Sequence, residues 1–269
     1  MDGVAALLDG PRAHGAFLLR SMLDPPWSLR IEDRAPLAVV ALVRGEAWLE
    51  PDDAEPIALT PGDVAIIRGP EPYTVADRPG RPPQVVVHPG GGCEAIAGAG
   101  PSAPSMLGAR TWGTSRDGAT VMLTGAYQLD GEVSRRLLRA LPQRIVLRDA
   151  HCPIIPLLAD EIDRDHPGQE AVLDRLLDLL LVAALRDWLA RPEAQAPGWY
   201  RAYADPEVGR ALRLLHAEPA RAWTVASLAR EVGVSRASLA RRFAALVGEP
   251  PMAFLAELRI ALAADLLHE

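Results

Sequence analysis

The densest group of side chains that could do chemistry is a run of arginines near the carboxyl end of the chain. Residues 221–248 hold five arginines and one acid, Glu231, although the net charge of the whole chain is −7. An arginine guanidinium forms paired hydrogen bonds with phosphate oxygens and with guanine edges. Attraction to a polyanion depends on the local field, so this segment predicts a nucleic-acid site. The alternative is a solvated, arginine-rich helix face.

Two histidines and two cysteines form a second candidate group. His88 and Cys93 flank a Pro-Gly-Gly-Gly loop, and His151 and Cys152 are adjacent. These four side chains could hold zinc if the fold brings the pairs together, although their spacing is not that of a zinc finger. The thiols could also form a redox switch. We favour an ordinary structural role, with Cys93 as a loop thiol and Cys152 as a small buried hydrophobe, and expect no cofactor.

Three short helices would position the arginines. Asp205, followed by proline, is typical of a helix start, and Thr224 is a candidate cap for a second helix over residues 225–232. Gly233 supplies a turn, and Ser235 caps a third helix that carries arginines. This order predicts a helix-turn-helix. The alternative is a small three-helix packing unit without a DNA function.

A helical wheel at 3.6 residues per turn assigns the third helix its faces. Leu239, Phe243 and Leu246 form the core edge, which leaves Arg241 pointing outward. First-turn residues of such a helix reach base edges, whereas arginines nearer the core edge or on the preceding helix are better placed for phosphates. The predicted DNA-binding residues are Arg236, Ala237, Ala240 and Arg241 for bases and Arg242 and Arg230 for phosphates, together with Ser238, to which no particular contact is assigned.

Upstream of these helices, short apolar strands alternate with turns. The predicted strands cover residues 37–43, 47–50, 57–59, 64–67, 84–88, 109–113 and 120–129. Their even spacing is typical of a small antiparallel β-barrel. The hydrophobic period then changes to that of helices, over residues 133–141, 157–162 and 169–189.

The predicted helix over residues 169–189 is apolar around more than one stripe. One stripe suffices for packing on the barrel, so the remainder predicts contact with a second subunit. We therefore expect a homodimer. The residues predicted at its interface are Leu173, Leu176, Leu177, Leu180 and Trp188.

Several motifs resemble a known family. The segments WTVASLA (223–229), GVSRASLARRF (233–243), VGEPP (247–251) and LAELRIALAADLL (255–267) look like the first half of an AraC-type DNA-binding domain. Upstream, LP (141–142), PGQ (167–169), LRDW (185–188) and DP (205–206) resemble the subgroup with an amino-terminal cupin sensor domain.

This resemblance implies a transcription regulator, usually dimeric, that binds specific sequences of double-stranded DNA. Its sensor domain would respond to a small-molecule effector or a redox signal. Residues 252–267 look like the start of the helix that joins two helix-turn-helix units in this family, so we expect this chain to hold one unit and to lack the second.

A cupin enzyme without DNA binding, or a metal or thiol sensor fragment, is the alternative function. Cupin metal sites take histidines from a first strand pair and from a return strand. Residues 37–50 contain no histidine, and Tyr73 stands where the last histidine would fall. We therefore expect no metal at the usual cupin site and no enzymatic activity.

The predicted fold class is α+β, with a cupin-like antiparallel β-barrel followed by helices and an all-α helix-turn-helix domain. The expected boundaries are a sensor domain at 1–148, a helical dimerisation segment at 149–191, a linker at 192–203 and a DNA-binding domain at 204–269. The chain has neither an apolar run of membrane-spanning length nor the basic and apolar regions of a signal peptide, so we expect a cytosolic protein.

Overall fold

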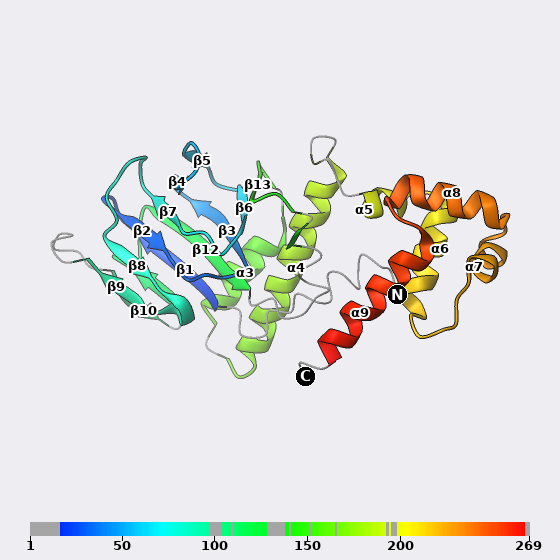
Figure 1. The fold of residues 1–269 in the computed structure, drawn as a ribbon. Helices are drawn as coiled ribbons and strands as arrows, with labels where there is room; N and C mark the ends of the chain where they lie inside the picture. The colour runs from blue at the N-terminus through cyan, green and yellow to red at the C-terminus, as the bar shows by residue number, and fades with distance from the viewer. Residues whose placement is uncertain are drawn as a thin grey trace. The chain divides into compact units, whose positions relative to one another are not determined.

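A computed structural model describes residues 17–96, 104–108, 110–127, 138–139, 141–150, 152–164, 166–191, 194 and 198–266. The chain divides into two compact units (Figure 1). Of the described residues, those of 17–127 and 141–188 form the β unit, and those of 138–139 and 189–266 form the helical unit. Most of the helix predicted over residues 133–141 lies outside the described residues. None of the described helices is both long and apolar enough to cross a membrane.

Thirteen described strands make up the sheets of the β unit. They are β1 Phe17–Leu23, β2 Ser28–Ile31, β3 Leu37–Arg44, β4 Ala47–Pro51, β5 Ile57–Leu59, β6 Val64–Arg68, β7 Tyr73–Ala76, β8 Val85–Val87, β9 Cys93–Ala95, β10 Ser105–Gly108, β11 Thr111–Gly113, β12 Thr120–Tyr127 and β13 Arg144–Leu147. The first sheet has the order β10-β11-β1-β12-β3-β6-β13, and the second has the order β5-β4-β7-β2-β8-β9. Most pairs are antiparallel, and β1–β11 and β2–β8 are parallel.

The main core of the β unit lies between these two sheets. Met122 on β12 and Leu42 on β3 pack from the first sheet, and Leu49 and Val75 pack from the second. The predicted α+β class is confirmed. The described strands, however, form two facing sheets rather than one continuous barrel wall.

Two helices of the β unit, α3 (Ile154–Ile162) and α4 (Gln169–Ala190), follow the strands. The Tyr127 hydroxyl donates a hydrogen bond to the backbone carbonyl of Leu177 on α4 at 2.7 Å. Gly125 on the same strand leaves room for α4, because a Cβ there would lie 2.8 Å from the Leu177 side chain. The first sheet is therefore covered on both faces, which explains the unbroken apolar run of β3.

The packing of α4 changes the predicted dimer interface. Leu173, Leu177 and Leu180 are at most 1% exposed within the chain itself, so they cannot form the partner face that the sequence predicted. Leu176 and Trp188 are partly exposed. The sequence misplaced the stripe because a helix that is apolar over a wide arc does not indicate which side meets the sheet.

A different apolar stripe of α4 faces outward. Val172 is 44% exposed and Leu179 is 50% exposed, and the half-buried Leu176 and Ala183 continue the row. The spacing of these four positions is four, three and four residues, which keeps them on one helix face.

The helical unit consists of α5 (Gly198–Ala202), α6 (Pro206–Ala217), α7 (Val225–Val232), α8 (Arg236–Val247) and α9 (Pro251–Leu266). These helices enclose one apolar core, to which α6, α7, α8 and α9 all contribute; among its members are Leu212, Leu228, Leu239, Phe243 and Phe254. Leu246, predicted at the core edge, is 37% exposed instead.

The predicted helix starts of this unit are confirmed. Asp205 accepts hydrogen bonds from two backbone N–H groups of α6, and Thr224 forms a reciprocal cap with Ser227 on α7. Gly233 adopts a φ of +83° at the end of α7, which favours glycine, and Ser235 caps α8.

Helix α5 lies within the segment predicted as a linker. It packs on α8, where a Cβ at Gly198 would lie only 2.6 Å from the carbonyl oxygen of Leu246. At least these residues of the predicted linker are therefore part of the helical unit.

Candidate nucleic-acid interface

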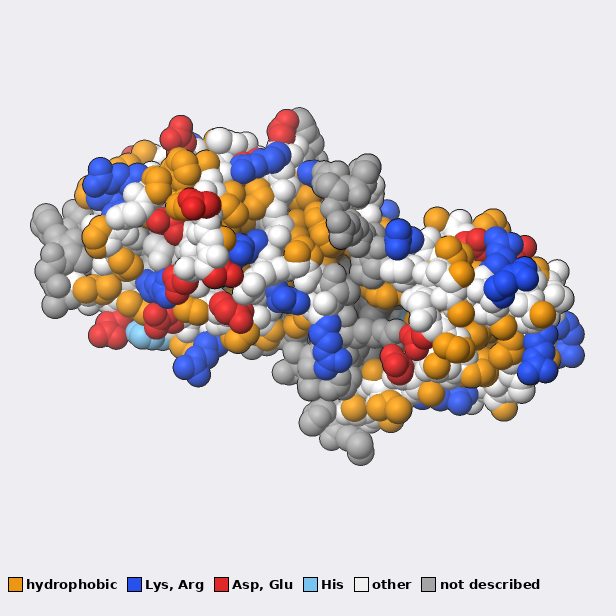
Figure 2. All heavy atoms as spheres, turned by 45° about the horizontal axis from the view of Figure 1, so that its top comes forward, with side chains coloured by type: hydrophobic (Ala, Val, Ile, Leu, Met, Phe, Trp, Pro, Cys, Tyr) orange, Lys and Arg blue, Asp and Glu red, His pale blue; other side chains and the backbone are white. Residues whose placement is uncertain are grey.

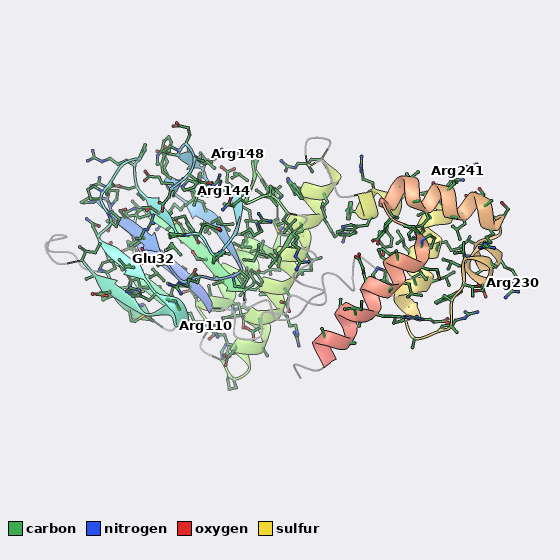
Figure 3. The ribbon with its side chains drawn as sticks, viewed as in Figure 1. Glu32, Arg110, Arg144, Arg148, Arg230 and Arg241 are labelled. Atoms are coloured by element: carbon green, nitrogen blue, oxygen red, sulfur yellow. The ribbon has the colours of Figure 1, made fainter. Side chains whose placement is uncertain are left out.

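The turn between α7 and α8 presents the predicted DNA-binding residues at the surface. Arg236 and Ala237 form the exposed first turn of α8, and Arg241 is exposed one turn later. Arg230 is exposed on α7 (Figure 3). Ser238 and Ala240 are half-buried beside them, and the backbone N–H of Ser238 donates to the Ser235 cap.

Arg221 lies in the same basic segment but is neutralised within the helical unit. Its guanidinium contacts Glu218 and Glu231, each at 3.1 Å, and stacks over the Trp223 ring at 4.0 Å from the ring centre. These contacts hold the connection between α6 and α7, so Arg221 belongs to the structure of the unit rather than to its free basic surface.

Arg242 is also engaged within the helical unit. It pairs with the Asp205 carboxylate at 2.7 Å and with the Glu207 carboxylate, both at the start of α6. The hydrogen bond that Arg242 donates to the Asp205 carboxylate is the main cause that raises the pKa of Arg242. Arg242 was predicted to contact phosphate, but in this structure two carboxylates occupy its donors.

Three arginines of the segment therefore remain available. The guanidinium groups of Arg230, Arg236 and Arg241 make no hydrogen bond or ion pair with any residue that the structure describes. Figure 2 shows separate groups of basic side chains on the visible surface of the helical unit. The arrangement is a helix-turn-helix whose outer surface offers unpaired guanidinium donors.

The sequence prediction missed two arginines of α6. Arg210 and Arg213 are exposed, opposite the buried Val208, Ala211 and Leu212. The apolar stripe of α6 was the available signal, because it places both arginines on the outer face of this helix.

The histidine and cysteine group is only partly described. His88 contacts Glu94 at 3.1 Å, and Cys93 is exposed on β9, where neighbouring atoms partly desolvate its thiol and raise its pKa. Cys152 is partly buried before α3, and His151 lies outside the described residues. No three metal-binding side chains gather within the part of the chain that the structure describes.

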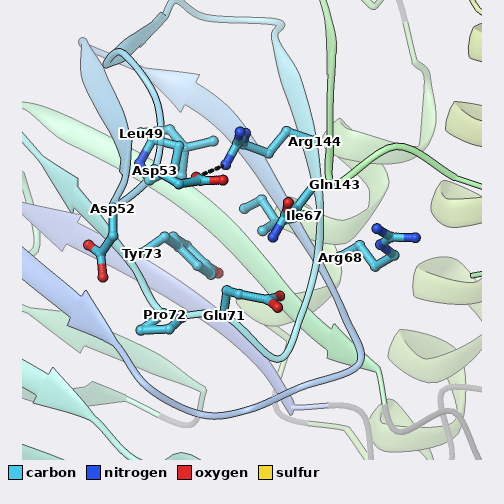
Figure 4. Close-up of a pocket in the computed structure, with 11 residues that line it drawn as sticks. Leu49, Asp52, Asp53, Ile67, Arg68, Glu71, Pro72, Tyr73, Gln143 and Arg144 are labelled. Atoms are coloured by element: carbon cyan, nitrogen blue, oxygen red, sulfur yellow. Dashed lines mark hydrogen bonds and ion pairs between the residues drawn. The ribbon is translucent and has the colours of Figure 1, made fainter.

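A cavity opens between the two sheets of the β unit (Figure 4). Its volume is about 160 Å³, and its walls include Leu49, Ile67, Pro72 and Tyr73. The Tyr73 hydroxyl is buried and has no hydrogen-bond partner among the described residues. Burial is the main cause that raises the pKa of this phenol, so the group stays neutral and can donate. Tyr73 is the residue that the sequence placed where a cupin histidine would fall.

Comparisons with known proteins agree with this division of the chain. A family profile described as Cupin matches residues 2–190. A putative AraC-like transcription regulator from Streptomyces lividans is 31% identical over 250 residues, covering 90% of this chain and 78% of the relative. The HTH-type transcriptional regulator AlkR from Acinetobacter baylyi is 32% identical over 163 residues, covering 58% of this chain and 53% of the relative.

A solved structure of apo ToxT from Vibrio cholerae also aligns with the chain. It has a TM-score of 0.38 and 7% identity, and the alignment covers 92% of this chain and 99% of that protein.

Proposed function

We propose that this chain, which belongs to the AraC-like transcription regulators and carries an amino-terminal cupin domain, regulates transcription by binding specific double-stranded DNA through α7 and α8. One observation carries the proposal. Arg230, Arg236 and Arg241 are exposed on this helix-turn-helix without a described partner, whereas Arg221 and Arg242 are neutralised inside the unit.

The positions on α8 suggest different contacts. Arg236 and Arg241 would read base edges from the major groove, and Ala237 would present its methyl group to a thymine. Arg230, on the preceding helix, would contact phosphate. Such a protein acts in the compartment that holds the chromosome, so we place it in the cytoplasm.

The test compares two charge-matched double variants of the full chain on a pool of randomised duplex DNA. R236Q/R241Q removes two unpaired arginines of α8, and R34Q/R78Q removes two exposed arginines of the β unit. The first variant should weaken specific binding at least about tenfold, because each base contact contributes roughly 1–3 kcal/mol. The second should leave binding unchanged. Equal losses would mean that only the total charge matters.

We also propose that two copies associate through the outward stripe of α4. Val172, Leu176, Leu179 and Ala183 repeat with the alternating four and three spacing of two-helix packing. A second copy presents the same stripe, so the contact would be self-complementary.

The cupin domain would receive the signal in this scheme. Relatives of the chain are named as transcription regulators, and we propose that this chain likewise senses a ligand rather than transforming one. The cavity between the two sheets is a candidate site for such a molecule, because Leu49, Ile67 and Pro72 give it apolar walls beside charged side chains.

A further inference from the structure

We infer that Arg259 of α9 is a positioning residue for DNA binding: it holds the connection between α6 and α7 and so sets the direction in which Arg230 projects from α7. This inference rests on the DNA-binding function proposed above. The contacts that carry it all lie within the helical unit, so part of its test needs no DNA.

The connection between α6 and α7 covers residues 218–224. It closes partly on itself, because the carbonyl of Glu218 accepts from the backbone N–H of Arg221 at 3.1 Å and from Nε1 of Trp223 at 3.0 Å. Arg259 supplies two further donors, and its Nε and Nη2 groups reach the carbonyls of Pro219 and Arg221, each at 2.7 Å. These two donors form one edge of a planar guanidinium, so together they fix the path of the connection.

The side chain of Arg221 extends this hold to α7. Its guanidinium stacks over the Trp223 ring and pairs with Glu231, the neighbour of Arg230 on α7, at 3.1 Å. Arg221 and Glu231 are partly exposed, so their pair orients α7 more than it stabilises the fold. Arg259 therefore holds the backbone of the residue whose side chain contacts α7 beside Arg230.

The second helix of the motif is held by different contacts. Arg242 on α8 pairs with Asp205 and Glu207 at the start of α6. Figure 3 shows Arg230 and Arg241 on separate helices of the unit. The contribution of Arg230 to DNA binding should therefore depend on Arg259, and the contribution of Arg241 should not.

Double-mutant cycles on the full chain test this dependence, with a duplex that the unmodified chain selects from a randomised pool. R259M keeps an apolar stem but removes both donors. In the unmodified chain, R230A should lower the slope of log affinity against log salt by about one. In R259M that slope should already be lower by about one, and adding R230A should not lower it further. R241A should reduce affinity by the same factor in both backgrounds.

An additive result would overturn the inference. If R230A lowers the slope equally in both backgrounds, Arg259 either contacts phosphate itself or only stabilises the fold. Loss of the R241A effect in R259M would also overturn it, because the disturbance would then not be confined to α7.

Hydrogen exchange without DNA separates this inference from the proposed function. R259M should speed exchange of the amides of α7 by about threefold or more and leave those of α8 unchanged. R213M is the matched control, because Arg213 is an exposed arginine of α6 that makes no hydrogen bond or ion pair with the described residues. It should leave the exchange of α7 unchanged.

Unchanged exchange in R259M, or equal acceleration in α7 and α8, would overturn the role of Arg259. A chain that selects no duplex but shows faster exchange in α7 alone would contradict the DNA-binding function and would leave the hold of Arg259 on α7 supported.

Discussion

Arg242 of α8 and Asp205 at the start of α6 form an ion pair of 2.7 Å that links the two helices. Asp205 also accepts hydrogen bonds from the backbone N–H groups of Glu207 and Val208. Burial opposes its ionisation, but these donors and Arg242 outweigh that effect and lower the pKa of Asp205. One carboxylate therefore both caps α6 and holds α8, which fixes the direction in which Arg236 and Arg241 project.

Arg242 and Arg230 should differ in what their removal changes. R242A breaks the link to α6, so it should lower the melting temperature of the helical unit and leave the salt dependence of DNA binding unchanged. R230A removes a phosphate contact, so it should reduce the slope of log affinity against log salt by about one and leave stability unchanged. Calorimetry and binding titrations at several salt concentrations measure both effects. A reduced salt slope in R242A would show that Arg242 contacts phosphate, as the sequence predicted.

Local sequence signals were sufficient to predict where the helices of the helical unit begin and where they turn. The caps at Asp205, Thr224 and Ser235 and the turn at Gly233 depend on residues within three or four positions of one another. Such contacts are encoded in the local sequence, and the structure confirms them.

Contacts between residues far apart in the chain could not be predicted from such local signals. The two partners of Arg242 lie 35 and 37 positions away in the sequence, so the charge pattern alone did not show that Arg242 is paired. The sequence also did not show which face of α4 packs inward, because contacts with the distant strand β12 determine that face. Gly125, in the middle of an apolar strand, was the available signal of a close neighbour. The cavity beside Tyr73 likewise arises from β4, β6, β7 and β13, of which β7 and β13 were not predicted.

The stability of the β unit should depend on pH through Asp63. Asp63 is 1% exposed; burial opposes its charge, but donors from Thr60, Asp149 and Arg148 outweigh that effect and lower its pKa. Because the pKa of Asp63 is lower in the folded state, its charge stabilises the fold at pH values above the unfolded pKa of about 3.9. This stabilisation is lost as the pH falls through the folded pKa. D63N should cost about 2 kcal/mol at neutral pH and less at a pH well below the unfolded value of about 3.9, as measured by urea unfolding. An equal cost at both pH values would show that charge is not the cause.

Dimerisation should depend on Leu179 and not on Leu157. Both leucines are exposed, at 50% on α4 and 53% on α3, but only Leu179 belongs to the outward stripe of α4. L179D places a charge in the proposed contact and should give monomers, whereas L157D should remain dimeric. Sedimentation at micromolar concentration distinguishes the two. A monomeric unmodified chain, or monomers from both variants, would contradict the proposed interface.

Arg241 should determine preference at one base position of the DNA site. Its guanidinium is exposed and makes no ion pair or hydrogen bond with the described residues. It lies on the side of α8 opposite the buried Leu239 and Phe243. R241A should therefore cost roughly 1–3 kcal/mol at the preferred site and relax the preference at one position, because a bidentate contact with a base edge is lost. R241K keeps the charge but not the paired geometry, so it should restore general affinity without restoring the preference. Sequencing of bound DNA from a randomised pool at two salt concentrations separates these effects. If R241K restores both, Arg241 contacts the backbone, and the base preference must come from Arg236 and Ala237 in the first turn.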